Sequence, residues 1–363
     1  MKALVLSVLL LTPVSAFAQD LVVSEPDFST SVFRAEVVEI HATGERATPA
    51  TRTVAEFQDL SLRLLEGARE GEVVRAENSN GTTLSKGDVV YIHRVDGAEG
   101  DLWSVGEPDR RWVLFGLLIL FVLITIGVGW GAGVRSVLSL FGSLLIILFG
   151  LIPALLSGAP PVLTCTFFAV LMLVFSMLVT HGYKKSTWVA LISGIVALVF
   201  AAVIAEGAVL LAKLSGFVSD EVVFLNFATR GTLDLTGLLL GSILIGVVGV
   251  LNDISVSQVH TIEEIHDANP RLSRLEVFMR AARVGREHLG AVVNTLPIAY
   301  AGSALPLLMM FSVSTAPLLY IINREVFAAE IIRIFAGGIA LAFSGAIATV
   351  IGALLLVSPK KGA

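Results

Sequence analysis

Residues 112–130 read WVLFGLLILFVLITIGVGW, an apolar stretch without a single charged side chain. A helix needs about 20 apolar residues to cross the roughly 30 Å of hydrocarbon in a bilayer, so this stretch predicts a transmembrane helix. The whole chain agrees, because 55% of its residues are hydrophobic, 15% are charged and the mean hydropathy is +0.85. Such an excess of apolar side chains predicts an α-helical polytopic membrane protein.

Apolar stretches of similar length follow as far as the C-terminus. They predict about seven transmembrane helices, at residues 112–130, 136–156, 162–180, 187–205, 233–251, 291–312 and 331–357. The apolar stretch 317–322 is too short to cross, and polar residues follow it. We therefore expect the segment from Thr315 to Ile334 to be interfacial or re-entrant.

The region before the first span has a different character. Residues 1–18 combine Lys2, an apolar run and Ala16-Phe17-Ala18, the pattern of a cleavable signal peptide; an uncleaved anchor is the alternative. Residues 19–111 carry charges throughout and alternate with period two, as in 33–40 and 88–92, which predicts strands joined by turns such as Asn80-Gly81. We expect a small β-rich barrel or sandwich.

Signal cleavage and seven crossings together predict an orientation. They place the β-rich domain on the extracytoplasmic side of the membrane and the connection 252–290 and the tail 358–363 in the cytoplasm. Basic residues should then gather on the cytoplasmic side, and most do. Those in the predicted cytoplasmic segments are Arg135, Lys184, Lys185, Arg271, Arg274, Arg280, Arg283, Arg286, Lys360 and Lys361.

Polar residues gather at both ends of the fifth predicted span. Asp234, at its start, either caps the helix or serves a function, because a carboxylate facing lipid is costly. At its far end Asn252 precedes a series spaced four, three and four residues apart, which a continuous helix would place on one face. Such a stripe of polar side chains is suited to line a vestibule, bind a cation or pass protons. The alternative is a helix face that is simply exposed to solvent. The members of the stripe are Asp253, Ser257, His260 and Glu264.

The sixth predicted span carries Asn294, Thr295, Pro297 and Tyr300. A proline within a helix frees a backbone carbonyl and kinks the chain, which occurs at transport sites and also in purely structural helices. Polar side chains in membranes likewise serve either a pathway or contacts between helices. The arginines of the predicted cytoplasmic segments, Arg286 among them, are explained first by the orientation of the protein in the membrane. Contact with an anionic lipid or ligand is the second explanation.

Other patterns predict no site. Glu263 and His266 have the spacing of carboxylate-bridged metal sites without the second pair such sites need, and His41 and His93 are isolated on alternating strands. The glycines from 127 to 133 lack the context of a phosphate loop. We expect no metal, no cofactor and no nucleic acid, and no catalytic motif of an enzyme is recognised.

Several short motifs occur between Gly231 and Pro306, and their order along the chain is more specific than any single motif. They are Asp-Leu-x-Gly-Leu-Leu-Leu-Gly, Gly-x-x-Asn-Asp, Glu-Ile-His-x-x-Asn-Pro, Val-Gly-Arg-Glu, Asn-Thr-Leu and Ala-Tyr-x-Gly. This block resembles the YibE/F-like family of bacterial membrane proteins, with Glu287 where the family usually has Asp. The resemblance implies a multi-pass plasma-membrane protein and implies no particular reaction.

Two functions follow as hypotheses. The first is transport of a small solute or ion along the polar residues of the fifth and sixth spans. The second is a non-transporting scaffold or sensor whose outer β domain binds a partner. The expected partners are membrane lipids, the solute or ion, and a second copy of the chain or an extracytoplasmic protein.

Overall fold

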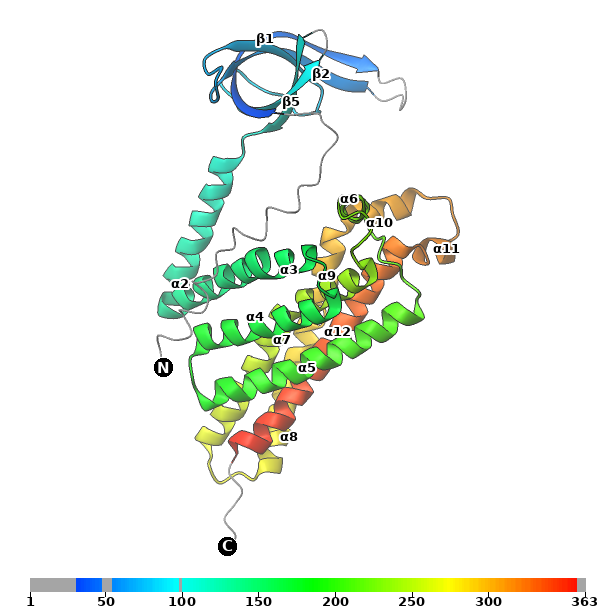
Figure 1. Ribbon diagram of the computed structural model, residues 1–363. Helices are drawn as coiled ribbons and strands as arrows, with labels where there is room; N and C mark the ends of the chain where they lie inside the picture. The colour runs from blue at the N-terminus through cyan, green and yellow to red at the C-terminus, as the bar shows by residue number, and fades with distance from the viewer. Residues whose placement is uncertain (1–30, 48–53, 98–99, 358–363) are drawn as a thin grey trace. The chain divides into compact units, whose positions relative to one another are not determined.

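The computed structural model describes residues 31–47, 54–97 and 100–357. The predicted signal peptide and cytoplasmic tail lie outside these residues. The described residues divide into two compact units, one that ends at Ile124 and one that begins at Thr125, and this boundary falls within the helix that follows the barrel. Figure 1 shows the course of the chain.

The first unit is a closed five-stranded barrel with strand order β1-β2-β3-β5-β4. Its strands are β1 (Ser31–Ala47), β2 (Val54–Leu64), β3 (Val73–Asn78), β4 (Val89–Gly97) and β5 (Gly100–Pro108). Neighbouring strands are antiparallel except β3 and β5, which pair in parallel at Glu77 and Ser104. This confirms the predicted β-rich domain, in a five-stranded architecture like that of OB-fold barrels.

The period-two pattern accounts for the barrel core. Leu60, Leu62 and Leu64 of β2 point inward, as do Val74 and Ala76 of β3, while the residues between them are more exposed. Gly44 of β1 lies against the ring of Phe57, where a Cβ would approach Cε1 to 2.9 Å. The barrel therefore has its own apolar interior.

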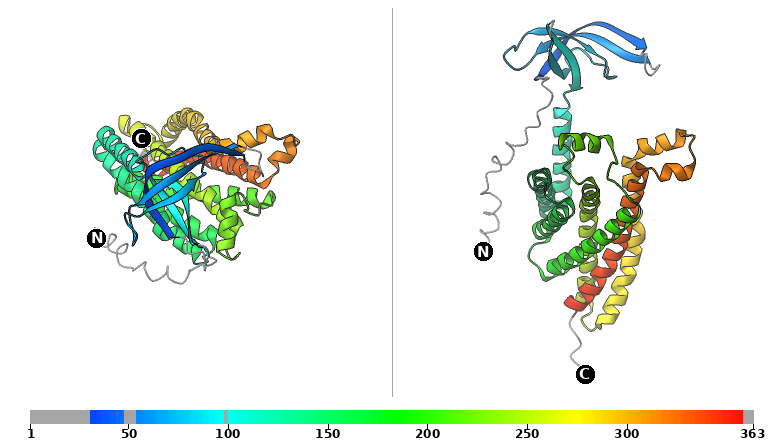
Figure 2. Two further views of the ribbon diagram at one scale, coloured as in Figure 1. Left: turned by 90° about the horizontal axis from the view of Figure 1, so that it is seen from above. Right: turned by 45° about the vertical axis from the view of Figure 1, so that its right-hand side comes forward.

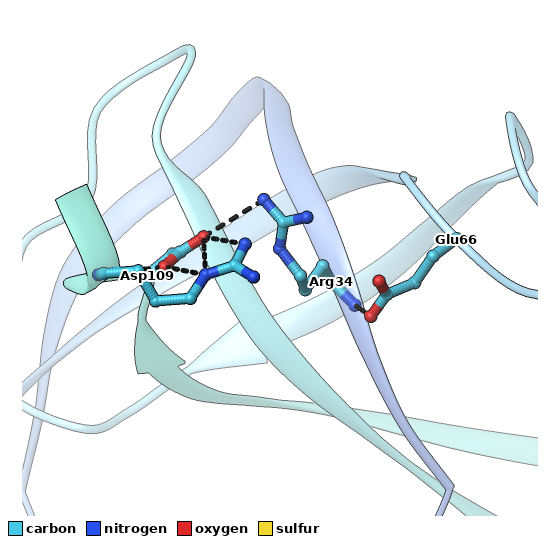
Figure 3. A network of polar contacts seen from close by, with 4 residues as sticks. Arg34, Glu66 and Asp109 are labelled. Atoms are coloured by element: carbon cyan, nitrogen blue, oxygen red, sulfur yellow. Dashed lines mark hydrogen bonds and ion pairs between the residues drawn. The ribbon is translucent and has the colours of Figure 1, made fainter. Parts of the chain in front are cut away.

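An ion cluster joins the barrel to the helix that follows it (Figure 3). The Asp109 carboxylate accepts hydrogen bonds from Arg34 of β1, at 3.1 Å, and from Arg111, the first residue of that helix, at 2.8 Å. Arg34 also donates its backbone N–H to Glu66, at 3.0 Å. The Arg111 guanidinium beside Asp109 holds the pKa of that carboxyl well below its usual range.

The second unit is a bundle of helices (Figures 1 and 2). Its elements are α2 (Arg111–Ile146, which begins in the first unit), the π-helical turn η2 (Ile147–Leu151), α3 (Ile152–Leu156), α4 (Pro161–His181), α5 (Lys185–Leu211), α6 (Asp220–Ala228), α7 (Leu235–Ala268), α8 (Arg274–Val292), α9 (Thr295–Ser303), α10 (Leu305–Val313), α11 (Leu318–Ile322) and α12 (Glu325–Leu356). Helices α4, α5, α7 and α12 enclose the main apolar core.

Close backbone contacts hold these helices together. A Cβ added to Gly241 of α7 would overlap the Cys165 sulfur of α4, and one added to Gly345 of α12 would lie 3.6 Å from Ile254 of α7. Small residues at these positions let the helix backbones approach closely. At one end of the bundle the Glu325 carboxylate accepts from the amides of Ser215 and Gly216, both at 2.6 Å.

Among the described residues, five helical segments are long and apolar enough to cross a membrane: Arg111–Leu156, Pro161–His181, Lys185–Leu211, Leu235–Ala268 and Glu325–Leu356. The predicted count of seven is not confirmed. The first two predicted spans are two helices of one segment, Arg111–Leu156, that meet at a kink at Trp130, where the backbone is not helical, with φ of 49° and ψ of −130°. Gly133 lies directly against the Thr125 carbonyl there, although eight residues of straight helix would separate these positions by about 12 Å.

The sixth predicted span is not one helix. Residues 291–312 contain the end of α8, a turn at residues 293–294, and the two nine-residue helices α9 and α10. Pro297 explains the break, because its ring lacks an N–H and clashes with the carbonyl four residues earlier, that of Val293. Pro306 likewise stands at the start of α10. The last predicted span begins earlier than expected, at Glu325.

Candidate functional site

A cavity of about 400 Å³ lies between α2, α4 and α7. More than half of its lining side chains are polar, although all three helices are candidate membrane spans. The polar lining residues are Ser136, Ser139, Ser143, Ser176, Thr180, His181, Asn252 and Asp253. Polar groups inside membrane helices are costly and line functional pathways in many membrane proteins. We therefore take this cavity as the candidate site.

Glycines bring the serines of α2 close to α4. A Cβ at Gly142 would overlap the ring of Phe175, and one at Gly150 would overlap the ring of Phe168. The Ser139 hydroxyl then donates a hydrogen bond to the Ser176 hydroxyl, at 2.9 Å. The serine-bearing face of α2 is thus held against α4 by close contacts that larger residues would prevent.

The α7 side of the cavity carries Asn252 and Asp253, two of the residues that the sequence singles out. The Asn252 amide donates to the Asp253 carboxylate at 3.3 Å, while Asn252 Oδ1 is buried and has no hydrogen-bond partner among the described residues. Asp253 is the only acidic residue among those that line the cavity. This end of the cavity therefore offers oxygen atoms that are free to accept from a ligand.

The predicted stripe on α7 exists as a single helix face. α7 is continuous from Leu235 to Ala268, so Asp253, Ser257, His260 and Glu264 share one side of it, and all are at least partly exposed. The opposite side, with Ile254, is buried. His260 extends the stripe towards α4, because its ring lies 5.7 Å from the ring of His181, measured between centroids. Its Nδ1 lies 3.2 Å from Glu263 Oε2.

Asp234 serves as a helix cap. It is the N-cap residue of α7, and its carboxylate accepts from the Gly237 amide at 2.9 Å. The capping interpretation is confirmed. Asp234 also borders a separate cavity of about 270 Å³, between the start of α4 and the start of α7.

The predicted residues of the sixth span do not line the polar cavity. Asn294 and Thr295 are exposed at the junction of α8 and α9. Tyr300 of α9 reaches Gly246 of α7, where its hydroxyl would lie 2.5 Å from an added Cβ. Its ring also lies 5.9 Å from the Arg333 guanidinium. The fifth and sixth predicted spans therefore meet through Tyr300, outside the cavity.

Two groups of polar residues were missed by the sequence prediction. Glu330 and Arg333 of α12 form an ion pair at 2.5 Å within a candidate membrane span. Both charges are visible in the sequence near the start of an apolar run, but the prediction did not single them out. The serines at 136, 139 and 143 are spaced three and four residues apart, which places them on one helix face. That spacing could have identified the cavity wall.

Within residues 31–47, 54–97 and 100–357, no three His, Cys, Asp or Glu side chains are arranged to hold a metal ion. Glu263, the first residue of the Glu-x-x-His spacing, lies instead beside His260.

Comparison with protein families extends over nearly the whole helical unit. A family model described as YibE/F-like protein matches residues 117–358. The chain belongs to the YibE/F-like family. No curated protein and no solved structure matches it. The match contains the motif block from Gly231 to Pro306 and the polar cavity of this YibE/F-like chain, and the barrel of residues 31–108 precedes it.

Proposed function

We propose that this YibE/F-like protein moves a small polar solute or ion across the membrane, by way of the cavity between α2, α4 and α7. The observation that carries the proposal is the polar lining of a cavity whose three helices are candidate membrane spans. Hydroxyl, amide, imidazole and carboxylate groups replace the hydrogen bonds that a small polar species loses on leaving water.

The stripe on α7 supports a path that continues beyond the cavity. Asp253 lies at the cavity, and His260 and Glu264 follow along the same helix face to the last turns of α7. His181 connects the two parts, since it lines the cavity and also faces His260. Carboxylate and imidazole groups in series suit a cation or a proton.

The α2 wall has a feature suited to rearrangement. Ile147 lines the cavity and is the first residue of η2, a π-helical turn of five residues. Single π-helical turns leave local hydrogen bonding irregular and occur frequently at functional sites. In this proposal η2 changes its hydrogen bonding when the cavity opens or closes.

We further propose that the protein lies in the bacterial inner membrane with the barrel outside and the α7–α8 connection in the cytoplasm. The exposed arginines of α8 support this orientation, because basic residues are enriched in cytoplasmic segments. Labelling of single cysteines introduced at Ser85 in the barrel and at Arg271 tests it. In intact cells an impermeant maleimide should modify the first and spare the second.

Flux measurements in proteoliposomes test the transport proposal. Comparison of solute and metal content in cells with and without the protein first selects the species to assay. Asp253→Asn and the double variant Ser139→Ala/Ser176→Ala should lower its flux. Glu206→Gln is the matched control, because Glu206 is an exposed acid in the candidate span α5 that does not line the cavity. Unchanged flux in Asp253→Asn would refute this pathway.

A sensor remains the second proposal, and the Asp109 cluster favours it. The carboxylate ties β1 through Arg34 and the first turn of α2 through Arg111, so a partner that deforms the barrel would act directly on the helix. Deletion of residues 19–109 discriminates between the two functions. Flux that persists without the barrel supports transport, whereas a physiological response that requires the barrel supports a sensor.

A further inference from the structure

A second large cavity, of about 480 Å³, lies between α7, α8 and α12. It shares no lining residue with the polar cavity, because α7 presents Ile254 and Gln258 to this side and Asp253 to the other. Most of its wall is apolar, with Phe278 and Leu289 from α8 and small residues such as Ala346 from α12. The proposed pathway makes no use of this cavity.

The wall of this cavity is built around Gln258. Its side chain is 4% exposed and donates a hydrogen bond from Nε2 to the Ala281 carbonyl of α8, at 2.9 Å. Gly285 permits this approach, since an added Cβ would lie 2.8 Å from Gln258 Oε1. Val277 and Ala281 of α8 are fully buried. α8 is therefore fixed on α7, and the cavity is part of the fold.

Two arginines one helical turn apart line the cavity from α8. Arg283 and Arg286 are exposed, and neither forms an ion pair within the described part of the chain. His288 lines the same side. A site with two uncompensated guanidinium groups beside an apolar wall is complementary to an amphiphile with an anionic head.

The exposed surface of α8 points to a membrane lipid as that amphiphile. Leu275 is 64% exposed and Met279 is 51% exposed. Leu275, Met279 and Arg283 follow one another at intervals of four residues, on one side of the helix. A helix that combines exposed apolar side chains with arginines lies at the membrane interface, where the long arginine stems reach the headgroups. Ile254 and Val350, at the inner wall, belong to candidate membrane spans.

We propose that this cavity binds an anionic phospholipid. The phosphate lies between Arg283 and Arg286, and an acyl chain lies along the small residues of α12, Ala342, Gly345 and Ala346. These small residues leave room that larger side chains would fill. The site requires both parts, because the guanidinium groups select the charge and the apolar wall selects the chain.

Lipid titration of the purified full-length protein tests the proposal. Dioleoyl-phosphatidylglycerol is added in detergent, and bound lipid is counted by native mass spectrometry, with the zwitterionic dioleoyl-phosphatidylcholine, which has no net charge, as the comparison. The double variant Arg283→Gln/Arg286→Gln should bind phosphatidylglycerol about thirtyfold more weakly, since each basic residue near a lipid headgroup contributes about a fivefold gain in affinity. Ala346→Trp should weaken binding by filling the apolar part.

Two controls make the result decisive. Arg280→Gln removes an exposed arginine of the same helix that does not line the cavity, so it should change binding far less. Glycerol 3-phosphate should not displace the lipid. Equal binding by the double variant and Arg280→Gln, undiminished binding by a folded Ala346→Trp, or displacement by glycerol 3-phosphate would each overturn the assignment to a phospholipid.

Discussion

The imidazole rings of His181 and His260 lie 5.7 Å apart, between centroids, with their planes tilted by 52°. His181 ends α4 and borders the polar cavity, while His260 belongs to the exposed stripe of α7. The pair therefore forms a second connection between the cavity and the stripe, beside Asp253, which belongs to both.

Replacing His181 should interrupt this connection. His181→Gln keeps a hydrogen-bonding side chain of similar reach and removes the ability to carry a proton at neutral pH. If the transported species is a proton or is coupled to one, the flux in proteoliposomes should fall while solute binding is retained. Tyr183→Phe is the control, because this exposed residue lies just beyond α4 and does not line the cavity. Equal flux in both variants would show that protons do not pass through His181.

Of the four glycines at positions 127, 129, 131 and 133, only Gly133 has a close neighbour at the bend near Trp130. Gly133→Ala should lower the free energy of unfolding by about 1–3 kcal/mol, because the new Cβ overlaps the Thr125 carbonyl. Gly131→Ala has open space around its Cβ and should be neutral or slightly stabilising. Thermal unfolding in detergent compares the two variants. Equal destabilisation would mean that the bend tolerates a side chain at position 133.

The contact between α7 and α9 can be tested by a double-mutant cycle. Gly246→Ala should destabilise the protein by about 1–3 kcal/mol, because the Tyr300 hydroxyl would lie 2.5 Å from the new Cβ. Tyr300→Phe removes that hydroxyl, so the double variant should recover most of the loss. Unfolding midpoints of the four proteins give the coupling free energy, and additive effects would exclude this contact.

The Asp109 cluster predicts a pH dependence for the barrel. The pKa of Asp109 is lowered in the folded protein, so its contribution to stability is complete above the unfolded pKa of about 3.9 and disappears as pH falls towards the folded value. The difference in thermal midpoint between wild type and Asp109→Asn should be constant from pH 7 to pH 5 and shrink below about pH 4. The unfolding of the barrel is followed by fluorine NMR of fluorotryptophan at position 103, because Trp103 packs against Phe33.

Much of the fold was predictable because its signals are local. Alternation in stretches such as Val73–Asn78 predicts strands, and length and apolarity predict α4 to within one residue at each end. The same signals locate α5, α7 and α12, but α7 continues to Ala268 and α12 begins already at Glu325. The break at Val293 was not predicted, because a proline in an apolar stretch is compatible with both a kinked helix and two separate helices. The end of the first span at Trp130 agrees with the kink between two helices there, whereas the contact of Gly133 with Thr125 across this kink was not predictable.

One part of the candidate site, the polar stripe on α7, could be predicted from the sequence, and the other part, the cavity, could not. The stripe from Asp253 to Glu264 follows from spacing within one helix, and α7 is continuous there. The cavity needs three helices, and no local pattern places Ser139 opposite Ser176. Tyr300 illustrates the same limit, since its neighbour Arg333 lies in a different helix. Transport and the membrane orientation stay predictions.

The hydrogen bonds of the Glu325 carboxylate can form only late in the synthesis of this protein. Its acceptor atoms hold Ser215 and Gly216, and the sequence separation from Ser215 is 110 residues. A ribosome therefore delivers the loop after α5 long before the residue that fixes it. Until α12 is synthesised and inserted, the two amides lack this partner. A chain that ends before Glu325 should be recognised as unfinished by membrane proteases, whatever the state of its barrel.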